Sequence, residues 1–193
     1  MAGSERTACY SETVDKFEFI AVLLSIVFGL ALTNLLSGAL RAFLTRDLDL
    51  TRIAWTLSVG IILLVNWWGF FRWSDHLNWQ FWEFLYLVFW ATSHYLLAVS
   101  LFPYDFLDEY SEELQRRFLL WAMLAMVFAD VGESMLRGAL FDPWYFPMFY
   151  SWLVVCCVVP LVWRRSWVML SVGWVVFATV LSWSLVVRGI LSA

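Results

Sequence analysis

Six long apolar runs take up most of the chain, and they limit its possible folds more than any other feature. They are residues 17–41, 51–73, 79–102, 115–138, 144–163 and 166–188. Each is close to the roughly 20 residues that an α-helix needs to cross about 30 Å of hydrocarbon. Continuous apolar runs favour helices over a β-barrel, whose strands are shorter and alternate in polarity. The sequence therefore predicts an all-α, polytopic membrane protein whose six transmembrane helices form a single domain, residues 1–193.

Little polar sequence remains outside these runs, because 63% of the residues are hydrophobic and only 15% are charged. The N-terminal tail, residues 1–16, lacks the pattern of a cleaved signal peptide, so we expect the first helix to remain as an anchor. The acidic stretch 103–113 indicates a solvated loop. The three cysteines show no metal-ligand spacing and no basic run indicates nucleic acid, so we expect no cofactor, no metal and no nucleic-acid partner. Any function must lie between the helices or at their ends.

Six spans place both termini on one side of the membrane, which we call side A, and three of the loops on the opposite side B. Seven Lys or Arg residues lie near the span ends on side B and five on side A. The positive-inside rule then predicts that side B faces the cytoplasm and that the termini lie outside it. We expect a multi-pass protein of the cell membrane, in the bacterial inner membrane.

Aromatic residues crowd the turn between the second and third spans. Trp67, Trp68, Trp73, Trp79 and Trp82 fit the tryptophan belt that forms where lipid chains meet headgroups. Glu83 follows about one turn inside the third span, where an unpaired carboxylate is costly. Arg72 is the nearest cation along the sequence. The pair predicts either an anchoring salt bridge or a vestibule for ions.

One face of the third span carries Glu83, Trp90 and His94, which are seven and four residues apart. His94 falls near mid-membrane. A histidine at that depth can hydrogen-bond a neighbouring helix, belong to a proton or ion pathway, or ligate a haem or metal. The sequence leaves these three interpretations open.

The fourth span sets Asp130, Glu133 and Arg137 on one face, with Glu133 and Arg137 in the favourable order for a helical ion pair. Two acids and one base indicate either a buried structural ion pair or a site that attracts cations or holds a proton. Asn34 and Asn66 also lie within the spans, and each needs a partner in protein or water because lipid offers none.

Small residues recur every fourth position in the first span, at Ser25, Gly29, Thr33 and Ser37. This spacing predicts close helix packing, although a narrow pore using Thr33 would need the same residues. The segments 20–40 and 120–140 also match at several positions. Because three spans separate the two copies, a true repeat would be inverted, as in many transporters.

Two stretches resemble the bacterial relatives of the lysosomal potassium channel, which are six-span proteins. Phe28–Thr33 (FGLALT) resembles an apolar segment of that family's pore-lining first helix. Asn66–Arg72 (NWWGFFR) and Leu101–Pro103 (LFP) resemble its second and third helices. The resemblance implies a multimeric cation channel.

The chain departs from that family at its most specific positions. The family's Arg-x-x-x-Phe-Ser-Asp motif is replaced by Asp15–Phe19 (DKFEF), and Trp67 and Trp68 stand where the family has histidines. The family's mechanisms of selectivity and gating are therefore not carried over to this chain.

Deep polar side chains persist where water, ions or partners compensate them, so the sequence favours a channel or small transporter for cations or protons. The predicted pathway comprises Glu83, His94, Asp130, Glu133, Asn66, Asn34 and Thr33, with Arg72 and Arg137 as charge partners. We expect the protein to work as a homo-oligomer in the lipid bilayer. The alternative is a scaffold or accessory subunit that transports nothing. An enzyme is not expected, because no nucleophile with its base is visible.

Overall fold

The structure, a computed structural model, describes the backbone of residues 2–46, 49–74, 76, 78–102, 112–141 and 144–191. Within these ranges it describes the side chains between residues 16 and 186, apart from that of residue 112. Its helices are α1 (Ala2–Leu44), α2 (Leu50–Phe70), α3 (Phe81–Leu101), α4 (Glu112–Leu136), α5 (Phe146–Val162) and α6 (Ser166–Leu191), with a short 3-10 helix, η1 (Phe71–Trp73), after α2. The described residues contain no strand. The predicted polytopic all-helical fold is therefore confirmed.

Five of the helices are long and apolar enough to cross a membrane. The exception is α5, whose 17 residues reach only the lower end of the usual range of about 17–25. The ends agree with the predicted spans within a few residues except at α1, which begins at Ala2 and whose membrane-crossing part begins at Lys16. Hydropathy marks only the part of a helix that meets lipid, so it missed this extension. Most of the predicted acidic loop, residues 103–111, lies outside the described residues.

Local capping fixes several helix ends. Asp49 caps α2, because its Oδ1 accepts a hydrogen bond from the backbone N–H of Arg52 at 2.7 Å. At the start of α3, Gln80 and Glu83 form a reciprocal capping box. Gly138 has φ +66° just after α4, a conformation that a residue without a Cβ adopts at no steric cost. These signals mark where α2 and α3 begin and where α4 ends.

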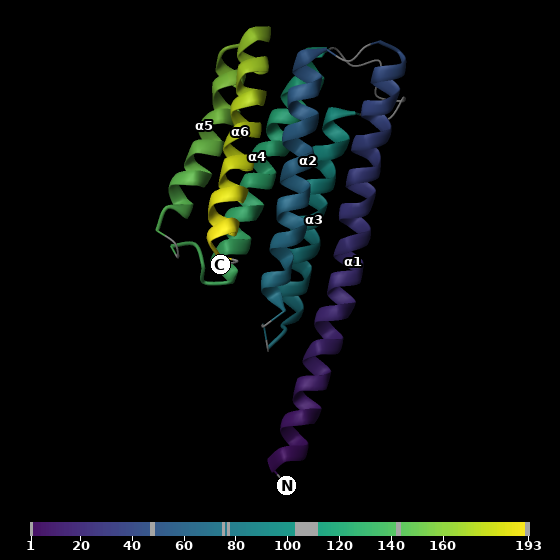
Figure 1. The fold of residues 1–193 in the computed structure, drawn as a ribbon, viewed down its shortest axis with the longest axis vertical. Coiled ribbons are helices and arrows are strands. Elements are labelled where there is room, and N and C mark those ends of the chain that lie inside the picture. Colours follow the sequence, from purple (N-terminus) through teal and green to yellow (C-terminus); the bar gives the residue numbers. More distant parts are fainter. Residues whose placement is uncertain are drawn as a thin grey trace.

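The helices form a closed bundle in which most helices that follow one another in the sequence are also neighbours in space, whereas α1–α3 and α2–α6 join helices that do not follow one another. Around the bundle the order is α1, α3, α4, α5, α6, α2, and α2 then returns to α1. The most extensive contacts join α3 to α4, α2 to α6 and α1 to α3. Figure 1 shows both termini and the α2–α3 and α4–α5 connections toward one end, and the α1–α2 and α5–α6 connections toward the other. These two ends correspond to side A and side B.

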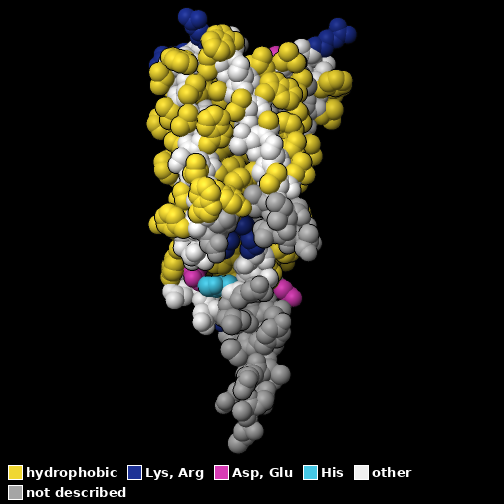
Figure 2. Space-filling view, turned by 60° about the vertical axis from the view of Figure 1, so that its left-hand side comes forward, with side chains coloured by type: hydrophobic (Ala, Val, Ile, Leu, Met, Phe, Trp, Pro, Cys, Tyr) yellow, Lys and Arg dark blue, Asp and Glu magenta, His cyan; other side chains and the backbone are white. Residues whose placement is uncertain are grey.

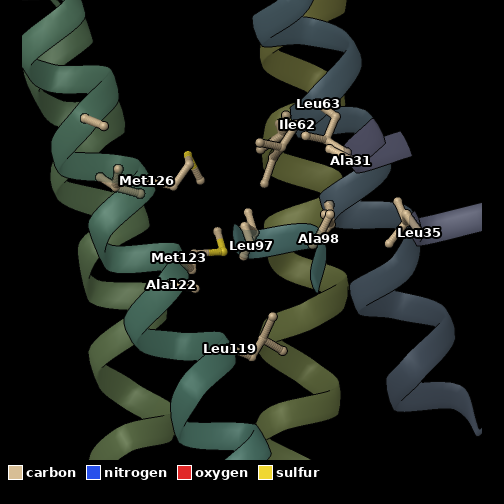
Figure 3. Close-up of a cluster of buried hydrophobic side chains, with 14 of the residues drawn as sticks. Ala31, Leu35, Ile62, Leu63, Leu97, Ala98, Leu119, Ala122, Met123 and Met126 are labelled. Carbon is tan, nitrogen blue, oxygen red and sulfur yellow. The ribbon is translucent and has the colours of Figure 1, made fainter. Parts of the chain in front are cut away.

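The core is apolar and joins all six helices. Figure 3 shows a part of it, with buried residues of α1, α2, α3 and α4. Two polar contacts lock α2 to α6 within this core. Trp55 Nε1 donates to the Met169 carbonyl at 3.1 Å, and Ser58 Oγ donates to the Gly173 carbonyl at 2.9 Å. Both contacts join helices more than 100 residues apart in sequence, so they fix the bundle rather than a hairpin.

The outer surface is apolar along most of the bundle. Figure 2 shows hydrophobic side chains covering the visible face, with charged side chains near the two ends. Large exposed side chains include Phe19, Val22, Ile26, Leu30 and Leu36 along α1. A surface this apolar is stable against lipid and not against water. The burial pattern therefore supports the membrane assignment.

The small-residue stripe lies on the exposed face of α1, where Ser25 Oγ accepts a hydrogen bond from Trp67 Nε1 of α2 at 3.2 Å. Close packing of the whole stripe against a helix stays a prediction. Ser25, Gly29, Thr33 and Ser37 are all exposed, and a Cβ added at Gly29 would meet nothing within 4 Å. The buried face of α1 instead carries larger residues such as Leu24 and Phe28. Periodicity identified one face of α1 correctly but gave no information on what lies against it.

The two halves of the chain do not pack alike. In the first half α1 and α3 make one of the most extensive contacts of the bundle, whereas the corresponding α4 and α6 make none of the main contacts among the described residues. The predicted inverted repeat would require these pairs to be equivalent. The matches between 20–40 and 120–140 therefore carry no support from the packing.

A glycine on α1 provides a test of this packing. A Cβ added at Gly38 would overlap the ring of Phe102, which lies at the end of α3, whereas Gly29 faces open space. We expect Gly38→Ala to lower the free energy of unfolding by about 1–3 kcal/mol through overpacking. Thermal unfolding in detergent micelles measures it, with Gly29→Ala as the matched control. Equal stability of the two variants would contradict the close approach of α1 and α3.

Candidate functional site: a buried carboxyl and histidine network

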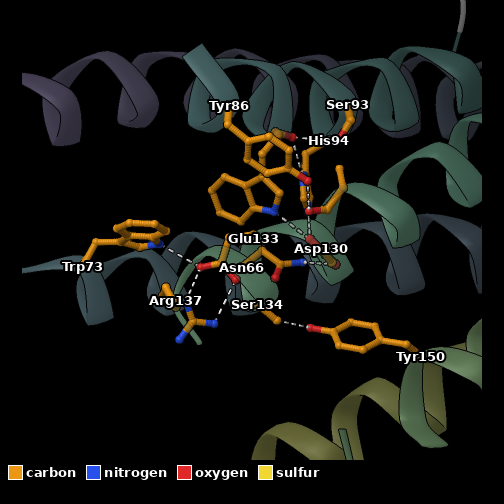
Figure 4. A network of polar contacts seen from close by, with 12 residues as sticks. Asn66, Trp73, Tyr86, Ser93, His94, Asp130, Glu133, Ser134, Arg137 and Tyr150 are labelled. Atoms are coloured by element: carbon orange, nitrogen blue, oxygen red, sulfur yellow. Dashed lines mark hydrogen bonds and ion pairs between the residues drawn. The ribbon is translucent and has the colours of Figure 1, made fainter. Parts of the chain in front are cut away.

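A polar network lies inside the side A half of the bundle, between α2, α3, α4 and α5 (Figure 4). Its buried polar and charged members are Glu83, Ser93, His94, Asp130, Glu133 and Ser134. Tyr86 anchors α3 to α4 there, because its hydroxyl donates to the Ala129 carbonyl at 2.9 Å. Ser134 and Tyr150 join α4 to α5 through their hydroxyls, also at 2.9 Å. The network thus fixes the relative positions of three helices.

Asp130 of α4 is the centre of the network. Trp90 Nε1 donates to its Oδ1 at 2.6 Å, and Asn66 Nδ2 donates to its Oδ2 at 3.4 Å. Each oxygen of this buried carboxyl group therefore has a donor from a different helix, α3 or α2. Asn66 finds in Asp130 the partner that its depth in the membrane requires.

His94 lies beside Asp130 and is completely buried, with 0% of its surface exposed. Its Nδ1 is 2.8 Å from the Trp90 carbonyl, and because a carbonyl only accepts, Nδ1 carries a hydrogen. Among the described residues the second ring nitrogen, Nε2, has no hydrogen-bond partner, and it lies 3.5 Å from Asp130 Oδ1. The rings of Phe28 and Trp90 pack against the imidazole, with centroids 5.3 and 4.9 Å away. An imidazole nitrogen without a hydrogen bond thus faces a carboxyl group in an otherwise apolar enclosure.

Glu133 and Arg137 form the predicted ion pair, and both are nearly buried. Arg137 Nη2 lies 2.8 Å from Glu133 Oε2, and the side chains are 11% and 7% exposed respectively. Trp73 Nε1 donates to Glu133 Oε1 at 2.7 Å. Trp73 is itself buried, so its predicted place in the headgroup belt is wrong. Its indole N–H is occupied by a carboxylate inside the protein instead of water at the interface.

Glu83 does not pair with Arg72, contrary to the prediction. Its Oε2 lies 3.1 Å from His76 Nε2 and accepts the Gln80 backbone N–H at 2.9 Å. Arg72 Nε donates to the Gly69 carbonyl at 3.1 Å. The turn between α2 and α3 brings His76 to the first turn of α3. His76 is nearer to Glu83 in the sequence than Arg72 is, but a search among Lys and Arg for the cation did not consider it.

The structure brings together five of the seven residues of the predicted pathway. Glu83, His94, Asp130 and Glu133 are buried, and Figure 4 shows the last three together with Asn66. The other two lie apart from them. Asn34 is half-buried and its Nδ2 donates to the Ala98 carbonyl at 3.4 Å, while Thr33 is exposed on α1. We therefore correct the pathway by removing Thr33 and Asn34.

Sequence analysis did not assign Trp73, Ser134 or Tyr150 to the site. Ser134 follows Glu133 directly, so its position on α4 was a usable signal. Tyr150 and Trp73 approach from other helices, and only the order of the helices around the bundle identifies them. In the described part of the chain no group of three or more His, Cys, Asp or Glu side chains could hold a metal ion.

Comparison with family models, with curated proteins and with solved structures finds no match to this chain. The resemblance to relatives of the lysosomal potassium channel therefore remains a prediction.

Proposed function

We propose that the protein is a small membrane transporter that carries protons, with Asp130 and His94 as the proton-binding pair. The observation that carries this proposal is the 3.5 Å approach of His94 Nε2, which has no hydrogen-bond partner among the described residues, to Asp130 Oδ1. Among the interpretations that the sequence leaves open for His94, this geometry favours the proton pathway. A histidine hydrogen-bonded only for packing would have both ring nitrogens occupied.

One proton can occupy two places in this pair without changing its total charge. When the carboxyl group of Asp130 holds the proton, His94 is neutral and its Nε2 lone pair faces the carboxyl oxygen. When the proton moves to Nε2, the carboxyl becomes a carboxylate and the imidazole an imidazolium. Trp90 and Asn66 donate to the carboxylate, and the Trp90 carbonyl accepts from Nδ1 in either state. Both states are neutral overall, which lowers the cost of proton movement at membrane depth.

The burial of the pair favours a carrier over an open pore. His94 and Asp130 are buried among aromatic side chains, so the proton must enter and leave through conformational change. At side A the partly exposed His76 contacts Glu83, and its ring also packs against Trp73, which binds Glu133. His76, Glu83 and Glu133 are thus titratable groups on the side A flank of the pair, with the indole of Trp73, which does not titrate, between His76 and Glu133. We accordingly propose entry or exit from side A.

The proposal is tested by proton flux into liposomes that contain the purified protein and a pH-sensitive dye. A potassium gradient with valinomycin provides the driving force. We expect Asp130→Asn to reduce the flux by about a hundredfold or more, since a positioned proton-transfer group typically contributes 10²–10⁴-fold. Glu18→Gln, an exposed acid on the side A part of α1, is the matched control and should not change the flux.

A scaffold or accessory subunit is the second candidate function, and the ion pair of Glu133 and Arg137 favours it. Glu133 and Arg137 lie at one end of the same helix, and Trp73 donates to Glu133 from the segment after α2, so this nearly buried carboxylate can have a structural role alone. This candidate predicts wild-type protein without proton flux, and an Asp130→Asn variant that assembles poorly. Equal flux for Asp130→Asn and wild type in intact protein would contradict the transporter. The homo-oligomer, the bacterial inner membrane and the orientation stay predictions.

A further inference from the structure

A cavity of about 550 Å³ opens at the side B end of the bundle, at the opposite end from the polar network. It lies between the first turns of α2, α4 and α6 and the last turn of α3. Three of the residues that line it are arginines, namely Arg52, Arg116 and Arg164. Its floor is apolar and includes Trp55 and Met169. No step of the proposed proton transport uses this cavity.

Among the described residues that line the cavity, three arginines outnumber two acids, Asp49 and Glu113. Asp49 is engaged as the cap of α2, where its Oδ1 accepts from the Arg52 backbone. Glu113 is the other acidic side chain of the lining, and it is shared among three guanidinium groups. Its oxygens lie 2.5 Å from Arg116 Nη2, 2.9 Å from Arg117 Nε and 3.5 Å from Arg164 Nε. One carboxylate cannot neutralise three cations.

Among the arginines that line the cavity, Arg116 gives the most specific evidence for a bound anion. Its side chain is only 16% exposed, and its Nε is buried without a hydrogen-bond partner among the described residues. A buried guanidinium N–H without an acceptor is costly, because the group has lost water and gained nothing in return. Arg116 also lines the cavity, so an anion bound beside its guanidinium group would compensate part of this cost.

The helix directions add to this preference. Because α2, α4 and α6 all begin at side B, the partly positive N-terminal ends of three helices surround one cavity. Thr51 and Ser166, in the first turns of α2 and α6, also line it and offer hydroxyl groups. Helix N-termini together with arginine side chains are the combination that binds phosphate groups in proteins.

We propose that this cavity binds a phosphate group carrying a net negative charge. Two sources share this chemistry. One is the headgroup of an anionic phospholipid, since the cavity lies at the end of the spans and has an apolar floor. The other is inorganic phosphate from solution. This inference does not depend on the proposed proton transport, and the failure of one would not affect the other.

The test measures the thermal stability of the purified full-length protein in a neutral detergent during titration with three probes. They are dihexanoyl phosphatidylglycerol, dihexanoyl phosphatidylcholine and inorganic phosphate, all at constant ionic strength set with sodium chloride. A rise in Tm with phosphatidylglycerol alone identifies a lipid headgroup, and a rise with inorganic phosphate identifies the free anion. Either result supports the site. No rise with any probe, or an equal rise with phosphatidylcholine, would overturn it.

Three variants make the test specific. Arg164→Gln should weaken the effective probe by about tenfold, the effect of losing one charged hydrogen bond. Its side chain is 60% exposed, so the substitution should not impair folding. Arg165→Gln removes the same charge from the neighbouring exposed residue, which does not line the cavity, and should leave the affinity unchanged. Arg116→Gln should weaken binding at least as strongly. Equal affinity in Arg164→Gln and wild type would contradict the proposal.

Discussion

Substituting Arg137 by methionine is expected to lower the free energy of unfolding by about 3–5 kcal/mol, because it leaves the buried carboxylate of Glu133 without its cation. The two side chains are nearly enclosed and lie 2.8 Å apart, and the carboxylate also accepts from Trp73. Neither water nor lipid can replace the guanidinium at that position. Unfolding by sodium dodecyl sulfate in mixed micelles, followed by tryptophan fluorescence, measures the change.

The double variant Glu133→Gln/Arg137→Met distinguishes loss of a pair from loss of packing. It should recover most of the stability, because it leaves no uncompensated charge and the glutamine oxygen can still accept from Trp73. Arg117→Met is the matched control, since Arg117 pairs with Glu113 on the same helix at the same spacing but at an exposed position. Its effect should be much smaller. A loss as large in Arg117→Met as in Arg137→Met would contradict the burial of the inner pair.

His94→Asn is expected to reduce proton flux by about a hundredfold while leaving the protein folded, because it removes the proton acceptor of the pair. The asparagine amide can still donate to the Trp90 carbonyl, which His94 Nδ1 binds in the wild type. It carries no counterpart of Nε2, the nitrogen that faces Asp130. Flux into liposomes, normalised to the amount of inserted protein, measures the effect.

The chain contains its own control for this experiment, because His76 is the only other histidine. It too contacts a carboxylate, Glu83, but it is partly exposed at the side A end. Solvent can replace it there, so His76→Asn should reduce the flux far less than His94→Asn. Asp130→Asn/His94→Asn should be no worse than either single variant, since the two residues act as a unit. Additive losses would show that they act separately.

Much of this fold was predictable from the sequence, because each helix in lipid must form its own backbone hydrogen bonds. A run such as 166–188 is long, apolar and uninterrupted, and no other structure satisfies its peptide groups in hydrocarbon. Helix faces were predictable for the same kind of reason. The spacing of Asp130, Glu133 and Arg137 places them together on any α-helix.

Partners across helices were not predictable, because periodicity says nothing about which helix lies opposite. Among Lys and Arg, the chain order suggested Arg72 for Glu83, yet the turn brings His76 there. It also suggested close packing for Gly29, which is exposed within this chain. Asn66 and Asp130 meet because α2 and α4 both reach the centre of the bundle, across 64 residues of sequence. The sequence thus shows reliably that a deep polar residue needs a partner, whereas only the structure identifies that partner.

Infrared difference spectroscopy on the purified protein, recorded in H2O and in D2O while the pH is changed, detects the one exchangeable proton that we propose Asp130 and His94 hold inside the membrane. We expect a carboxyl C=O band that changes with pH, shifts in D2O, disappears in Asp130→Asn and moves in His94→Asn. A spectrum without any carboxyl band that depends on Asp130, or one whose Asp130 band is unaffected by His94→Asn, would contradict the proposal.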